Sequence, residues 1–212
     1  MNGLLDFHTH RPDAEHAIIS VDPRQFDPQP GLWYSVGYHP WDVVDTLSEE
    51  DMDLLRQCAL HPQVLAIGET GLDALKGADL SVQEAAFARH LSLAAAVGKP
   101  VVAHSVRTAR QILDLRRKMH CADVALAIHG MRGNEHVARM FLDAGCYLSF
   151  GSRFNPEALR ATPLDRLLIE TDDGTAAIDE VAAALAQALG LTGQEVETLA
   201  AANIRRFIST DY

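Results

Sequence analysis

The sequence predicts an α/β fold, a closed or nearly closed barrel of eight strands with helices between most of them. Short apolar runs alternate with amphipathic segments almost to the end of the chain, a pattern typical of parallel β/α architecture. Polar residues follow most of the apolar runs, and the functional face of such a barrel lies at the carboxyl ends of its strands. The 212 residues are enough for a single domain, 1–212.

Eight apolar runs have the length and the composition of strands. They cover residues 4–10, 17–21, 32–38, 64–68, 100–104, 125–129, 146–150 and 167–171.

The segments between the later strands predict helices. Ser81 and Glu84 have the spacing of a capping box, and Gly98, followed by Lys99 and Pro100, ends this helix. Apolar residues at helical spacing, or a second capping box, predict the other helices. These cover residues 112–119, 137–144, 179–189 and 192–207.

The beginning of the chain breaks this pattern. Residues 11–16, between the first two predicted strands, are too few for a helical crossover. The next link, residues 22–31, contains three prolines and is not a helix either. Six extended residues reach about 20 Å, just enough to return along a short strand. We therefore expect a TIM-like (β/α)8 barrel without its first crossover helix, and we favour a hairpin with an antiparallel second strand over a parallel return.

Composition excludes several classes of protein. The formal charge of −11 argues against the long basic surface with which many proteins bind nucleic acid. Three scattered cysteines without a Cys-x-x-Cys pair predict neither a disulfide framework nor a thiolate zinc site, so a reducing, cytoplasmic setting is expected. No apolar stretch has the length of a membrane span, and no signal peptide is expected.

The first strand ends in "DFHTH", which places Asp6, His8 and His10 on one face. Such groups must be paired or bound to an ion if they are buried. When the pattern stands alone, an edge strand with a hydrated polar face is the favoured explanation.

Later strands supply the partners. Their ends carry further histidines and carboxylates, namely His39, Glu69, Asp73, His104, His129 and Asp172. Imidazoles and carboxylates bind zinc and manganese, and carboxylates also suit magnesium.

We therefore expect two divalent metal ions (Zn, Mg or Mn), because the candidate ligands are too many for one tetrahedral ion. The proposed bridge between the ions is Glu69. Asp6 is expected to orient a ligand imidazole from the second shell. The first ion takes His8, His10 and Asp172, and the second takes His104 and His129.

The motifs "DFHTH", "VGYHP", "IGETGLD", "VVAHS", "AIHG" and "IETDD", in this order, resemble the TatD family of metal-dependent deoxyribonucleases, within the amidohydrolase-like barrels. Asn203 and Phe207 are similar to the C-terminal Asn-x-x-x-Phe signature of that family. The resemblance implies that the six residues assigned above are the metal ligands. It also implies that His39 borders the substrate and meets a phosphate.

Some positions depart from the family pattern. Val106 stands where members commonly have an arginine, so Arg107 is a candidate replacement. Gly-Met-Arg-Gly replaces the usual Cys-Phe-Ser-Gly after His129, and Asp173 and Gly174 replace the usual small residue and proline. The chain thus resembles a short subgroup of the family with an altered substrate rim.

The predicted activity is hydrolysis of phosphodiester bonds by a metal-activated water, in a DNase that acts as a 3′ to 5′ exonuclease on single strands. The expected partner is therefore nucleic acid, bound as substrate at the end of a single strand. No association with a membrane is expected. We predict catalytic roles for Glu69 and for Asp172, the candidate proton acceptor. Contacts to substrate phosphate are assigned to His39, Arg107 and Arg153.

Three alternatives remain open at this point. An amidohydrolase-like barrel can hydrolyse a carboxylic ester or an amide, including an aminoacyl ester. The histidinol-phosphatase-like class also opens with His-x-His but typically ends its metal set with Asp-x-His, which Asp172 to Gly174 does not match. The third alternative is a non-catalytic subunit that keeps the metal site and binds a protein partner. The sequence does not indicate the oligomeric state.

Overall fold

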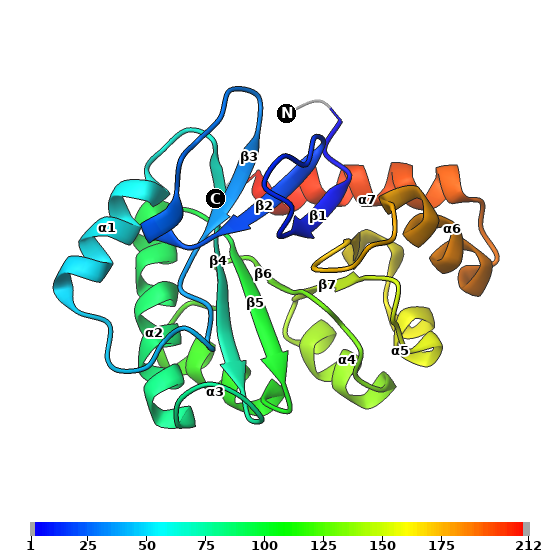
Figure 1. Ribbon diagram of the computed structural model, residues 1–212. Helices are drawn as coiled ribbons and strands as arrows, with labels where there is room; N and C mark the ends of the chain where they lie inside the picture. The colour runs from blue at the N-terminus through cyan, green and yellow to red at the C-terminus, as the bar shows by residue number, and fades with distance from the viewer. Residues whose placement is uncertain (1–2, 210–212) are drawn as a thin grey trace.

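Eight short apolar segments pair side by side in sequence order in the computed structural model of the protein, which describes residues 3–209 (Figure 1). Every neighbouring pair is parallel. A parallel bridge between Thr9 and Asp172 returns the sheet to its first strand. The predicted eight-stranded barrel is thus confirmed. Its strands are β1 (Asp6–Thr9), β2 (Ala17–Val21), β3 (Trp33–Val36), β4 (Val64–Asp73), β5 (Val101–Val106), β6 (Leu126–Ile128), β7 (Tyr147–Phe150) and β8 (Leu167–Ile169).

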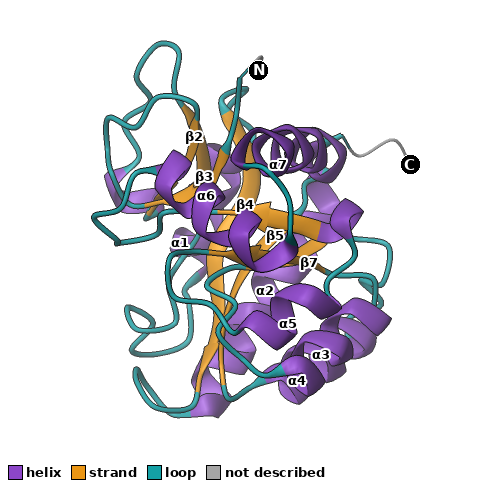
Figure 2. Ribbon diagram, turned by 90° about the vertical axis from the view of Figure 1, so that its right-hand side faces the viewer, coloured by secondary structure: helices purple, strands orange, loops and turns teal. Residues whose placement is uncertain are grey.

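Helices flank most of the strands, whereas loops lie beside β2 (Figure 2). The last helix packs Phe207 against the rings of Phe7 and Tyr147, at centroid distances of 5.2 and 5.3 Å. This contact joins the C-terminal helix to the first and seventh strands in one buried cluster. The helices are α1 (Glu49–Ala59), α2 (Leu80–Val97), α3 (Ala109–Lys118), α4 (Glu135–Asp143), α5 (Pro156–Ala161), α6 (Ile178–Leu189) and α7 (Gly193–Ile208), with short 3-10 turns η1 (Pro23–Gln25) and η2 (Leu164–Arg166).

Local capping explains the boundaries of some of the helices. Gly98 adopts a left-handed φ of 63° and ends α2, as predicted. Thr192 caps α7 through the predicted capping box. The box predicted at Ser81 is wrong, because α2 begins at Leu80, with Asp79 as its N-cap residue. The sequence analysis also missed α1, whose capping box is formed by Ser48, and α5.

The second strand runs parallel to the first, so the favoured hairpin is wrong. Residues 11–16 form a strap that returns along β1 without a helix, and the missing first crossover helix is confirmed. His16, with a φ of 61°, turns the chain back, and its carbonyl oxygen accepts from the amides of Leu5 and Asp6 at 2.8 and 3.2 Å. The strap is long enough because β1 has only four residues.

The three cysteines Cys58, Cys121 and Cys146 are buried and free, so none forms a disulfide. Within residues 3–209, no helix has the length and apolar character needed to cross a membrane.

Candidate metal and active site

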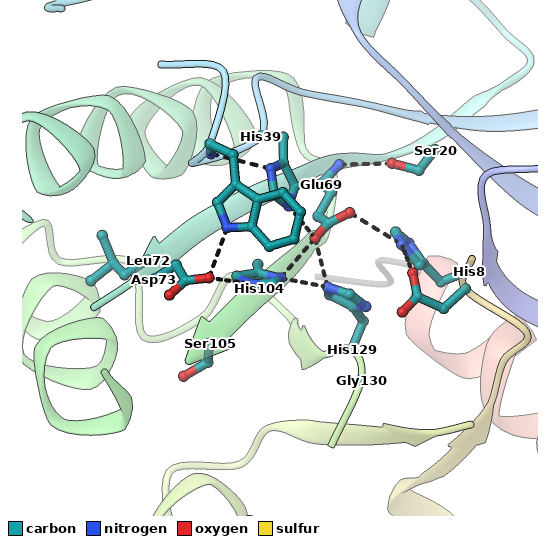
Figure 3. Close-up of polar contacts among 12 residues, drawn as sticks. His8, Ser20, His39, Glu69, Leu72, Asp73, His104, Ser105, His129 and Gly130 are labelled. Atoms are coloured by element: carbon teal, nitrogen blue, oxygen red, sulfur yellow. Dashed lines mark hydrogen bonds and ion pairs between the residues drawn. The ribbon is translucent and has the colours of Figure 1, made fainter. Parts of the chain in front are cut away.

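The carboxylate of Glu69 lies at the centre of a cluster of imidazoles (Figure 3). Its Oε2 atom is 3.2 Å from Nε2 of His8 and 3.2 Å from Nε2 of His10. Its Oε1 atom is 2.9 Å from Nε2 of His39, 3.0 Å from Nδ1 of His104 and 2.7 Å from Nε2 of His129. The two oxygens of one buried carboxylate therefore face two different groups of imidazole nitrogens, an arrangement that would suit a carboxylate shared between two cations.

Glycines on β4 explain how Glu69 reaches this position. Gly68 has a φ of 141°, and a Cβ atom there would overlap the carbonyl oxygen of Val102 on β5. Gly71 has a φ of 134°, and a Cβ atom there would overlap the carbonyl oxygen of His104. The Gly-Glu-x-Gly motif thus lets β4 and β5 approach closely on both sides of the glutamate.

Asp172 is placed by the closure of the barrel. Its amide donates to the carbonyl oxygen of His8 at 2.9 Å, and its own carbonyl oxygen accepts from the amide of His10 at 3.2 Å. Its backbone is left-handed, with a φ of 54°, a strained conformation for a residue with a side chain. As a result, its Oδ1 atom lies 3.8 and 3.7 Å from the Nε2 atoms of His8 and His10.

Asp73 orients the ring of His104. Its Oδ2 atom is 3.3 Å from Nε2 of His104 and accepts from the indole N–H of Trp41 at 2.7 Å. Its Oδ1 atom accepts from the amide of Leu75 at 2.7 Å, which fixes the carboxylate. This arrangement leaves Nδ1 of His104 facing Glu69. Carboxylates in this role select the tautomer and the direction of a ligand imidazole.

Glu170 takes the equivalent position behind His129, and the sequence analysis gave it no role. Its Oε1 atom lies 3.6 Å from Nδ1 of His129 and accepts from the amide of Gly130 at 2.5 Å. The side chain is buried, and Oε2 has no hydrogen-bond partner among the described residues. Its position in "IETDD", near the end of the eighth predicted strand, was the available signal.

Asp6 does not orient a ligand imidazole, contrary to the prediction. Its carboxylate accepts from the amide and the hydroxyl of Thr171 at 3.0 and 2.6 Å and from the backbone amide of His8 at 3.3 Å. Burial raises the pKa of Asp6 to about 6. Asp6 therefore ties β1 to the segment after β8, and its effect on the site is exerted through the backbone.

The buried polar atoms test whether this cluster suits metal ions. Both ring nitrogens of His8 and Oε2 of Glu69 are buried and have no hydrogen-bond partner among residues 3–209, although two of these atoms lie within 3.2 Å of each other. A buried polar group without a partner costs about 1 to 3 kcal/mol. Imidazole nitrogens and carboxylate oxygens are the donors that divalent ions take. The donor set therefore fits a metal site, and the ligand atoms of His8, His10 and Asp172 lie within 4.8 Å of one another.

The charges of the central groups are coupled. Burial alone would raise the pKa of Glu69, but the neighbouring imidazoles, His129 first among them, hold it well below its usual range. Burial likewise disfavours the charged form of His129, yet Glu69 and Glu170 raise its pKa well above the usual value. The carboxylate is therefore ionised, and a cation that binds at His129 has to displace a proton.

A cavity of about 1180 Å³ opens above this cluster. His39 lines it, as expected of a residue that borders the substrate. Arg107 and Arg153 are exposed and do not belong to its described lining, so their contact with substrate stays a prediction. Arg132, to which the sequence analysis gave no role, lies closer, with its Nη2 atom 3.6 Å from Oδ2 of Asp172.

Comparison with known proteins agrees with the resemblance drawn from the motifs. A family model described as "TatD related DNase" matches residues 25–209. The chain belongs to this family. Among curated TatD-family relatives, the chain is 29% identical over 170 residues to the uncharacterized metal-dependent hydrolase YabD of Bacillus subtilis, covering 76% of this chain and 64% of that protein. It is 36% identical over 151 residues to the "3'-5' ssDNA/RNA exonuclease TatD" of Cronobacter turicensis, covering 67% of this chain and 57% of that protein.

The chain thus spans less than two thirds of the length of these curated TatD relatives. Solved structures agree with the barrel. The TatD homologue YjjV of Escherichia coli superimposes with a TM-score of 0.78 at 20% identity, covering 90% of this chain and 85% of that one. A TatD family hydrolase from Entamoeba histolytica gives 0.77 at 14% identity and covers 97% of both chains. These similarities establish a TatD-like fold.

The position of Glu170 leads to a prediction for this TatD-family site. Glu170→Gln is expected to lower metal affinity or activity by about 10- to 100-fold, the usual cost of removing a carboxylate behind a ligand histidine. Metal titration and turnover of the purified variant measure this loss. Glu180→Gln, at the exposed start of α6, is the matched control. Unchanged metal affinity and turnover in Glu170→Gln would contradict the role in orienting His129.

Proposed function

We propose that this chain is a metal-dependent hydrolase of phosphodiester bonds that acts at the 3′ end of single-stranded nucleic acid. The observation that carries the proposal is the single buried carboxylate of Glu69 between two groups of imidazoles, since sites with two ions clamp the oxygens of a phosphoryl displacement. The name of the Cronobacter turicensis relative, an ssDNA/RNA exonuclease, supports the substrate class.

In this proposal His8, His10 and Asp172 would hold one ion and His104 and His129 would hold the other. Glu69 would be shared between them. Divalent ions in such a site activate a water molecule and neutralise charge on the phosphate.

Other side chains handle the proton and the substrate. Asp172 has one oxygen towards His8 and His10, and its second oxygen points to Arg132. This second oxygen receives the proton of the attacking water, because its side chain is 19% exposed and so within reach of solvent and substrate. His39 donates from Nε2 to a phosphate oxygen in place of its present partner, Glu69.

The test is a degradation assay with end-labelled single-stranded DNA and RNA and, in parallel, carboxylic ester substrates. Wild type with magnesium, manganese or zinc is expected to shorten the strands from the 3′ end. Asp172→Asn is expected to lower turnover by about 10²- to 10⁴-fold, the usual contribution of a positioned acid or base. Asp165→Asn, in η2 and outside the cavity lining, serves as the control. Intact strands together with ester turnover in the wild type would reject the proposal.

A further inference from the structure

The cavity is wider than the metal cluster requires. It continues from Glu69 over β2 to the link that follows this strand, where Gln25, Asp27 and Gln29 line it. Hydrogen bonds hold this link in place. The Gln63 amide donates to the carbonyl oxygens of Gln29 and Leu32 at 2.6 and 2.7 Å, and the backbone amide of Gln29 donates to the Tyr34 hydroxyl at 3.0 Å. The wall of the cavity is therefore formed in advance of any ligand.

This wall is acidic. Beside the candidate metal ligands, the lining includes the carboxylates Asp22, Asp27, Asp42 and Asp173. Among the described lining residues Arg24 is the one arginine, and Asp22 neutralises it by accepting from Nε and Nη2 at 2.9 and 2.5 Å.

The other cations near the site are also engaged. Arg132 lies against Asp172, and the Lys76 ammonium lies 3.8 Å from the centroid of the Trp41 ring. Neither Arg132 nor Lys76 belongs to the described lining of the cavity. Asp27, Asp42 and Asp173 thus remain without a basic partner among the described lining residues.

We infer that the acidic wall receives the uncharged 3′-terminal nucleoside of the strand and rejects a strand whose 3′ hydroxyl carries a phosphate. This inference rests on the proposed function. With the scissile phosphate at the ions, we place the 3′-terminal residue on the side of the cavity that Gln25, Asp27 and Gln29 line. A nucleoside offers neutral donors and acceptors that suit the amide of Gln25 and the side-chain oxygen of Gln29, whose Nε2 already donates to the carbonyl oxygen and Oδ2 of Asp27 at 3.2 and 3.1 Å. A terminal phosphate would instead bring almost two negative charges within a Debye length, about 10 Å, of these carboxylates.

The experiment compares one short single-stranded oligonucleotide with a 3′ hydroxyl, a 3′ phosphate, or a 5′ phosphate and a 3′ hydroxyl. At low ionic strength the 3′ phosphate is expected to lower kcat/KM about tenfold, whereas the 5′ phosphate leaves it unchanged. Because salt screens exposed charges, the difference should shrink as ionic strength rises.

Substitutions then locate the effect. Asp27→Asn combined with Asp42→Asn should reduce the discrimination to about threefold or less. Asp53→Asn combined with Asp143→Asn makes the same change in net charge outside the cavity lining and should leave the discrimination intact.

Three outcomes count against the inference. Equal or faster hydrolysis of the strand with a 3′ phosphate overturns it while the proposed function stands. Discrimination that the cavity substitutions do not change overturns the assignment to this wall. Failure to degrade any of the three strands rejects the proposed function, and the inference with it.

Discussion

Replacement of Glu69 by glutamine is expected to abolish hydrolysis, because the variant loses the one carboxylate that faces both groups of imidazoles. An amide has the same shape but lacks the negative charge that compensates two cations. Removal of one partner from a buried charge cluster costs about 3 to 5 kcal/mol, so metal binding should weaken by about 10²- to 10⁴-fold. Titration calorimetry and elemental analysis measure this loss directly.

The control is Glu157→Gln, at an exposed glutamate in the first turn of α5 and outside the cavity lining, which should retain metal and activity.

Proton release on metal binding adds a second measurement. Since the pKa of His129 is raised well above its usual value, metal binding to the wild type should release protons near neutral pH, and metal affinity should fall as pH decreases. Full metal content and activity in Glu69→Gln would overturn the bridging assignment.

Replacement of Arg116 by methionine is expected to cause a large loss of stability, about 3 to 5 kcal/mol. The buried guanidinium of Arg116, on α3, donates to four backbone carbonyl oxygens in the segments that follow α3 and α4. These belong to Cys121 at 3.2 Å, Ala122 at 2.7 Å, Val124 at 2.8 Å and Ala144 at 2.7 Å. The variant leaves these acceptors without their donor in a region closed to water.

Thermal unfolding should show the loss as a decrease in Tm of about 10 °C, since 1 kcal/mol corresponds to about 2 to 4 °C for a domain of this size. Arg110 lies on the same helix, but its side chain is 85% exposed and its ion pair with Asp114 is long, with Nε 3.9 Å from Oδ2 of that residue. Arg110→Met is therefore expected to change stability by no more than about 0.5 kcal/mol. A Tm for Arg116→Met equal to that of Arg110→Met would show that the carbonyl oxygens find other donors.

Predictions from the sequence depend either on neighbouring residues or on residues far apart in the chain. The positions of β2 and of the helices α4, α6 and α7 agree with local patterns, because alternation, helical periodicity and caps are properties of neighbouring residues. The direction of β2 was not predictable in the same way. A hairpin and a parallel strap place the same apolar residues in a sheet, and the choice depends on how β1 pairs with the rest of the barrel.

The sequence by itself determined the alternation of strands and helices, the missing first helix, and the order of polar residues at the strand ends, because each of these features depends on residues close together in the chain. Tertiary structure decided which atoms meet. Thr9 and Asp172 are 163 positions apart, yet their contact closes the barrel and aims Asp172 at His8 and His10. The supporting carboxylates Asp73 and Glu170 and the acidic wall near Asp27 likewise acquire their roles only from neighbours distant in sequence, because side-chain contacts between strands depend on the register of the closed sheet.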